Sequence, residues 1–227
     1  MSPRIKRCVG RPPAIDQDRL LQIAETHFAE RGFEGASTRK LCQEAKCNLA
    51  MISYYFGSKE GLYQKVIERH VKKFVNEAKE QNLRPAPNRI KKSFSAAEFE
   101  LYEILSSLSE SICSNKNIHA IIMRELMTGS KRIIKALLDS DLGVFGVIQK
   151  KLDQFKAEKK ISQDLNTRLA IVTLIGPIFY SNVSSSVIKS VYGFKDVDSN
   201  YMQMLSEHLT RSFFRAWGTT NKEALRK

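Results

Sequence analysis

The chain has 227 residues, of which 42% are hydrophobic and 27% are charged, so it can fold around a substantial core. Its formal net charge of +13 favours polyanionic partners such as nucleic acid or an anionic membrane face, although an ordinary basic protein could have the same balance. The four cysteines show no CxxC or dense disulfide spacing, and the sequence has neither a signal-peptide core nor an apolar run near the ~20 residues of a membrane span. These features argue against a disulfide-rich secreted domain and a membrane protein, and they predict a cytoplasmic protein.

The first segment, residues 1–13, is predicted to be a flexible basic arm, because Gly10, Pro12 and Pro13 oppose regular structure. Its segment Val9-Gly10-Arg11-Pro12 resembles half of the Arg-Gly-Arg-Pro core that enters A/T-rich minor grooves. Minor-groove insertion and simple attraction to phosphates are both consistent with this composition. The arm contains four cations and no acid, and these are predicted DNA contacts: Arg4, Lys6, Arg7 and Arg11.

A compact helical head is predicted over residues 14–74. Asp16 can cap a first helix whose apolar residues recur at helical spacing up to Gly32, where a left-handed stop is expected. Ser58 begins a longer fourth helix with its own apolar face.

Between these helices, residues 37–56 have the pattern of a helix-turn-helix. Ser37 and Asn48 can each cap a short helix, and Lys46 lies in the turn that joins them. A motif of this kind places its second helix in the major groove of double-stranded DNA. The sequence therefore predicts a DNA-binding protein.

The second helix of the motif divides into two sides. Cys47, Ile52 and Phe56 are spaced to hold the helix on its own domain, and the other residues are left to face bases and phosphates. For one of the two adjacent tyrosines, packing on the neighbouring helices is an equally good interpretation. The predicted DNA contacts in and around the motif are Thr38, Arg39, Lys46, Asn48, Ala50, Met51, Ser53, Tyr54, Tyr55 and Lys59.

The remainder, residues 75–227, is predicted to be a larger helical domain, which makes the whole chain all-α. Gly176-Pro177 should kink the most apolar of its helices. After a loop at 82–94 that contains two prolines, we expect helices at about 95–114, 116–129, 131–158, 163–191 and 198–218.

Catalytic and metal-binding patterns are missing from the sequence. It contains no GxSxG, HExxH, P-loop or complete GxGxxG segment, and its four histidines are scattered. Cys42 and Cys47 are close enough to suggest a redox pair, but they occupy positions that favour buried, small apolar side chains. We therefore expect no enzyme activity, no metal and no cofactor.

One set of residues runs through the head at characteristic positions: Leu20, Ala24, Phe28, Gly32-Phe33, Ser37-Thr38, Ala45, Tyr54-Tyr55-Phe56 and Ser58-Lys59-Glu60-Gly61-Leu62. Together these residues resemble the tetracycline-repressor (TetR) family. Lys46 stands where that family usually has glycine, Asn48 where it has Ser or Thr, and Ser53 where tyrosine is common. The sequence around the motif, together with Arg124-Glu125-Leu126 further along the chain, is similar to a branch of this family with a CecR-like C-terminal domain.

This resemblance implies a head joined by the long fourth helix to a C-terminal domain that dimerises and holds an inducer. Apolar stripes on the last two long helices could form an isologous interface, although an internal core would have the same pattern. The residues expected at the dimer interface are Val172, Ser184, Leu205, Leu209 and Phe213. The residues expected to contact the effector are Met123, Leu126, Met127, Leu137, Phe145, Phe179 and Tyr180, with Arg124, Glu125 or Tyr180 as orienting polar groups.

The leading hypothesis is a homodimeric repressor that a small-molecule effector releases from a palindromic operator. The alternative is a helical ligand-binding or scaffold protein whose head has lost specific DNA binding. The unusual residues Lys46 and Ser53 motivate that alternative.

Overall fold

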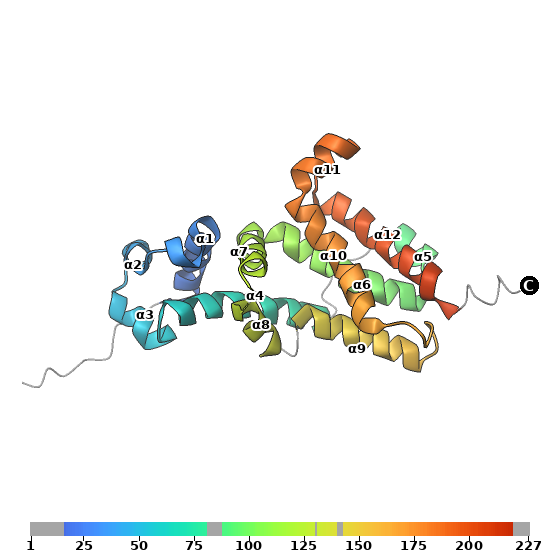
Figure 1. Ribbon diagram of the computed structural model, residues 1–227, viewed down its shortest axis with the longest axis horizontal. Coiled ribbons are helices and arrows are strands. Elements are labelled where there is room, and N and C mark those ends of the chain that lie inside the picture. The colour runs from blue at the N-terminus through green and yellow to red at the C-terminus, as the bar shows by residue number, and fades with distance from the viewer. Residues whose placement is uncertain (1–15, 81–87, 130, 140–142, 220–227) are drawn as a thin grey trace, which may run out of the picture.

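The computed structural model describes residues 16–80, 88–129, 131–139 and 143–219. The predicted arm, with Arg4, Lys6, Arg7 and Arg11, lies outside these residues. The described ranges are mostly helical and contain no β-strand, only an isolated bridge between Ile161 and Gly218. The all-α prediction is therefore confirmed (Figure 1).

The head consists of α1 (Gln17–Gly35), α2 (Thr38–Ala45), α3 (Leu49–Phe56) and the start of α4 (Lys59–Glu80). Asp16 accepts a hydrogen bond from the backbone N–H of Arg19 and thereby caps α1. Gly32 leaves helical geometry at φ 69° and ψ 178°, and a short helical segment continues to Gly35. The expected stop at Gly32 is thus a break inside α1.

The C-terminal part contains α5 to α12, and Figure 1 shows α4 running from the head into this part. The bounds of the eight helices are α5 (Asn88–Ser93), α6 (Ala96–Ser114), α7 (Lys116–Met127), α8 (Lys131–Leu138), α9 (Gly143–Ala157), α10 (Thr167–Val183), α11 (Ser185–Tyr192) and α12 (Ser199–Trp217).

Three predicted elements of this part are wrong. The loop at 82–94 contains α5, because Ile90 and Phe94 at i,i+4 spacing pack with Tyr102 on α6. The helix expected at 131–158 is two helices, and α9 begins at Gly143 with a φ of 55° in the left-handed region.

The helix expected at 163–191 is also divided, into α10 and α11, which meet at an angle of 83°. Gly176 and Pro177 lie within α10, and the change of direction occurs at Ser184 instead. Serine hydroxyls compete with helical hydrogen bonds, so a run of three serines is a natural place for the break.

Two hydrophobic clusters organise the molecule. The larger is formed by α6, α9, α10 and α12, with Leu101, Ile148 and Phe155 fully buried. The second joins α1 to α4 with α7 and α8, which contribute Ile121 and Ala136. The core of the head is therefore completed by helices from the C-terminal part.

Among the described residues, no single helix is long and apolar enough to span a membrane. The bent pair α10 and α11 reaches the necessary length and composition together, and Ile171, Leu174 and Ile178 of α10 are buried in the larger cluster.

Candidate nucleic-acid interface and ligand cavity

The turn between α2 and α3 has the geometry of a helix-turn-helix. Lys46 adopts φ 54° and ψ 42°, which is left-handed, and its backbone N–H donates to the carbonyls of Cys42 and Gln43. Asn48 then caps α3, because its Oδ1 accepts a hydrogen bond of 3.0 Å from the N–H of Met51. Both features agree with the predicted motif.

The inner side of α3 is wider than predicted. Ile52 is buried in the head cluster, and Cys47 and Phe56 are half-buried against it. Met51 is only 4% exposed, so its assignment as a DNA contact is wrong. Met51 and Tyr55 form an i,i+4 row beside Ile52 and Phe56, and the two adjacent rows face the domain together.

The outer side of α3 presents a small mixed surface. Ala50 and Ser53 are exposed, and Tyr54 has 63% of its surface exposed. Leu49, which was not predicted as a contact, is 46% exposed. It lies four residues before Ser53, and this i,i+4 relation to an outward residue was the signal in the sequence that could have identified it.

The two tyrosines have different environments. Their rings are in edge-to-face contact at 5.0 Å, and Tyr55 is half-buried and also contacts Phe56 at 6.5 Å. Tyr55 is therefore the tyrosine that packs on the protein, and Tyr54 projects from it. The contact between the rings supports Tyr54 in its exposed position.

Of the flanking residues, Arg39 and Lys46 are exposed and Thr38 is half-buried. Lys59 donates from Nζ to the carbonyl of Glu34 at 3.2 Å and lies 4.7 Å from the centre of the Phe33 ring. It therefore fastens α4 to the end of α1.

The two neighbouring cysteines are structural. Burial, with a hydrogen bond that the Cys42 thiol donates to Cys47, raises the pKa of Cys42 to about 12, which opposes the thiolate form that redox chemistry needs. Within the part of the chain that the structure describes, no group of His, Cys, Asp or Glu could hold a metal ion.

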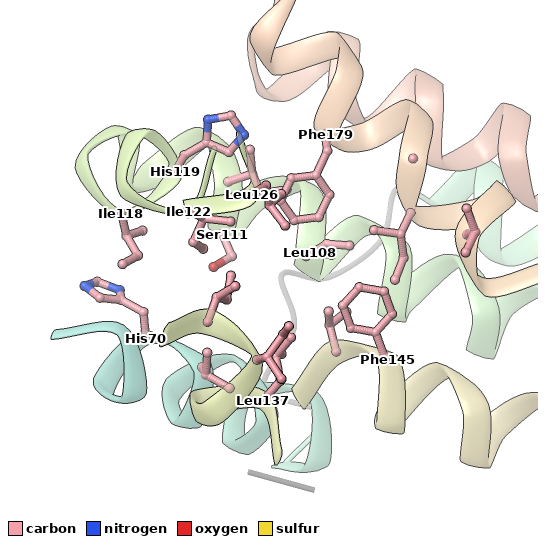
Figure 2. A pocket seen from close by; sticks show the side chains of 18 residues that line it. His70, Leu108, Ser111, Ile118, His119, Ile122, Leu126, Leu137, Phe145 and Phe179 are labelled. Carbon is pink, nitrogen blue, oxygen red and sulfur yellow. The ribbon is translucent and has the colours of Figure 1, made fainter. Parts of the chain in front are cut away.

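A second candidate site is an apolar cavity of about 540 Å³ where α4 and α6 to α10 meet (Figure 2). Of the predicted effector contacts, Leu126, Leu137, Phe145 and Phe179 line it. Met123, Met127 and Tyr180 do not, and Met127 and Tyr180 are exposed on the surface. Helical spacing could not separate these faces, because the cavity is bounded by six helices whose relative positions are tertiary.

The cavity also has three polar lining residues that were not predicted: His70, Ser111 and His119. His70 follows Leu62 and Val66 on the apolar face of α4, so its position in that row was an available signal. Its Nε2 lies 2.7 Å from Oε2 of Glu25 on α1.

The predicted orienting groups Arg124 and Glu125 face the head instead of the cavity. Nη1 of Arg124 donates to the carbonyl of Phe28 at 3.5 Å. Buried Glu125 accepts from the hydroxyl of Tyr63 at 2.9 Å and from Nη1 of Arg132 at 3.4 Å. Burial and the Glu125 carboxylate raise the pKa of Tyr63, which keeps this hydroxyl a donor. The face of α7 opposite the cavity is therefore fixed to the head.

The predicted interface residues fall into two groups. Val172 is exposed and also lines the cavity, and Ser184, Leu205 and Leu209 are half-buried. Phe213 is wrong as an interface residue, because it is buried in the larger cluster in contact with its neighbour Phe214. The apolar stripe of α12 is directed partly into its own subunit against α6.

Residues 20–66, which cover the helix-turn-helix and its supporting helices, match the family model for bacterial regulatory proteins of the tetR family. The helix-turn-helix head of this chain is therefore similar to the DNA-binding head of TetR-family regulators. The matched range begins in α1 and ends in α4, so it contains the turn at Lys46 and the whole of α3.

Curated relatives show the same similarity for the head of the chain. It is 40% identical over 62 residues to the HTH-type transcriptional repressor NicS of Pseudomonas putida, a match covering 27% of this chain and 29% of that protein. It is 37% identical over 51 residues to the probable HTH-type transcriptional regulator YttP of Bacillus subtilis, covering 22% and 25%. The chain thus matches only about a quarter of the length of these relatives.

Solved structures extend the likeness to the whole fold. The fatty acid degradation regulator FadR from Bacillus halodurans superimposes with a TM-score of 0.66 at 16% identity, covering 85% of this chain and 97% of that one. A linker-substituted mutant of HlyIIR gives a TM-score of 0.60 at 24% identity, covering 86% and 93%. At these identities the likeness establishes the fold alone.

Proposed function

We propose that this chain is a sequence-specific DNA-binding transcription regulator of the TetR family. It acts as a homodimeric repressor, which a small-molecule effector releases from a palindromic operator. The observation that carries the proposal is the outer side of α3, which is exposed immediately after a left-handed turn and an Asn cap.

The exposed surface of α3 has the chemistry that a major groove requires. An eight-residue helix is about 12 Å long, similar to the width of that groove. Leu49 can contact a thymine methyl group, Ala50 permits close approach, and Ser53 can bond to a base edge or phosphate. Tyr54 can donate to a phosphate, and the exposed cations Arg39 and Lys46 attract the backbone on either side.

Dimerisation is supported by an exposed apolar surface on α10 and α11. Val172, Tyr180 and Val183 are exposed large side chains at helical spacings on α10, and Val187 is exposed on α11. Packing this surface against the same surface of a second copy would bury it in an isologous contact. Such a dimer would carry two recognition helices, which must reach half-sites about 34–36 Å apart or a multiple of this.

Effector control is supported by the position of the cavity. Helix α4 lines the cavity through His70 and Val71, and its N-terminal half packs in the head cluster with α3. A ligand that favours one position of α4 would change the separation of the two heads. A coupling of about 1–3 kcal/mol would change operator affinity 5–150-fold. A structural neighbour, FadR from Bacillus subtilis, was solved in complex with stearoyl-CoA.

The experiment that tests this function is a binding selection with the full chain and random DNA duplexes. We expect a palindromic site to be enriched and binding to weaken steeply with salt, because phosphate contacts release counterions. No preferred sequence, together with a flat salt dependence, would instead favour the scaffold protein without specific DNA binding.

A matched pair of variants tests the role of α3. Leu49→Ala should weaken operator binding by about 1 kcal/mol, roughly fivefold, whereas Leu138→Ala truncates an exposed leucine on α8 and should leave binding unchanged. Equal losses of operator affinity in the two variants would contradict the assignment of α3 as the recognition helix.

A further inference from the structure

The cavity is lined almost entirely by hydrocarbon. Eighteen residues line it, and fifteen of them have apolar side chains or none, contributed by six helices (Figure 2). Its volume of about 540 Å³ equals the liquid volume of about 18 water molecules and lies within the usual range for sites that bind small organic molecules. A compact apolar compound therefore fits the cavity better than water does.

Charged ligands lack a partner in this wall. None of the described lining residues is Lys, Arg, Asp or Glu. His70 lines the cavity, but its Nε2 is already 2.7 Å from the Glu25 carboxylate. A ligand carboxylate or ammonium buried against this wall would lose its hydration without gaining an opposite charge.

One pair of polar groups on the wall remains available. The ring of His119 is 7% exposed and stacks on Phe179 at 5.9 Å and 24°, and its Nε2 has no hydrogen-bond partner among the described residues. Ser111 lies on the adjacent helix α6 and also lines the cavity. In Figure 2 the His119 ring lies at the top of the view, and Ser111 lies below it, nearer the centre. An unpaired buried nitrogen is costly, and a ligand group that satisfies it recovers that cost.

We propose that the cavity selects an electrically neutral, largely apolar small molecule whose single hydrogen-bonding group is bound by Ser111 and His119. Because burial lowers the pKa of His119, its imidazole is neutral and can donate or accept one hydrogen bond at neutral pH. The ligand class follows from the cavity itself. Only its consequence for DNA rests on the proposed regulatory function.

Displacement of the neutral dye Nile red from the DNA-free protein tests the ligand class. The competitors are decanol, decanoate and decylammonium, which share one chain and differ in charge. We expect decanol to displace the dye with a Kd at least about tenfold lower than those of both ions, because of their desolvation cost. Equal or tighter binding of either ion, or no displacement by decanol, would overturn the proposal.

The polar anchor is tested with Ser111→Ala and His119→Phe, which keep the size and the ring stacking, respectively. Each should weaken decanol binding about three- to tenfold and leave the binding of 1-chlorodecane, which lacks a hydroxyl, unchanged. His119→Asn, which retains a hydrogen-bonding amide, should recover part of the loss. Unchanged decanol binding in both folded variants would refute the anchor, with Ser111→Ala deciding the matter if His119→Phe does not fold.

The effect on DNA is measured separately. If decanol binds the protein but leaves the operator complex intact, the ligand class stands and effector-controlled release fails. If an ion binds in place of decanol and releases the operator, the regulatory function stands and the ligand class fails.

Discussion

Replacing Lys46 by glycine should move stability and DNA affinity in opposite directions. Lys46 holds φ 54° and ψ 42° at the turn of the helix-turn-helix, a conformation that costs a residue with a Cβ atom about 1–2 kcal/mol. Glycine removes that cost but increases the entropy of the unfolded chain by about 0.4–1 kcal/mol. We therefore expect Lys46→Gly to raise the free energy of unfolding by about 0.5–1 kcal/mol.

The same substitution removes an exposed cation from the proposed phosphate-binding surface. The slope of log affinity against log salt should become shallower by about 0.9 for each phosphate that Lys46 neutralises, which is about 2 for a dimer. Unfolding would be followed by calorimetry at constant protein concentration, where the melting temperature should rise by about 1–4 °C. Operator binding would be measured over a range of salt concentrations.

Two controls separate the causes. Lys46→Asn keeps a residue that tolerates left-handed backbone and removes the charge, so it should weaken DNA binding with little change in stability. Lys195→Ala removes an exposed cation far along the chain and should change neither measurement. A lower melting temperature for Lys46→Gly, or an unchanged salt slope, would refute this account of the turn.

Three further predictions concern the contact between the head and α7, the exposed face of α10, and His119 at the cavity. Tyr63→Phe should lower the free energy of unfolding by about 1.5–3 kcal/mol in urea titrations, because it removes the hydroxyl that donates to buried Glu125. The control Tyr192→Phe, on the surface, should leave the free energy of unfolding unchanged. Val183→Glu should convert the dimer to monomers in sedimentation experiments by placing a charge on the exposed face of α10, and a persisting dimer would place the interface elsewhere. Burial lowers the folded pKa of His119 below its ordinary value of 6.5, so its contribution to stability is present above pH 6.5 and is lost as the pH falls through the folded pKa. The His119→Phe protein should therefore lose less stability on acidification than the wild type, and parallel pH profiles would contradict a buried neutral imidazole.

Local patterns in the sequence were sufficient where neighbouring residues decide the structure. The caps at Ser37 and Asn48 and the left-handed turn at Lys46 involve atoms within a few residues of one another, and all three were predicted. Met51 was misplaced and Leu49 was missed, because the width of the buried side of α3 depends on how the other head helices pack against it. An eight-residue helix has too few turns for spacing alone to define that boundary.

The C-terminal part depends more strongly on tertiary structure. Its sequence determined the helical class and the strongly apolar nature of α10, because helical spacing and composition are local properties. Only the assembled fold decided that Phe213 is internal and that His119 lies beside Phe179 at a cavity. A cavity is the space left between helices from distant parts of the chain, so the side chains around it are defined by helix positions that no single segment encodes.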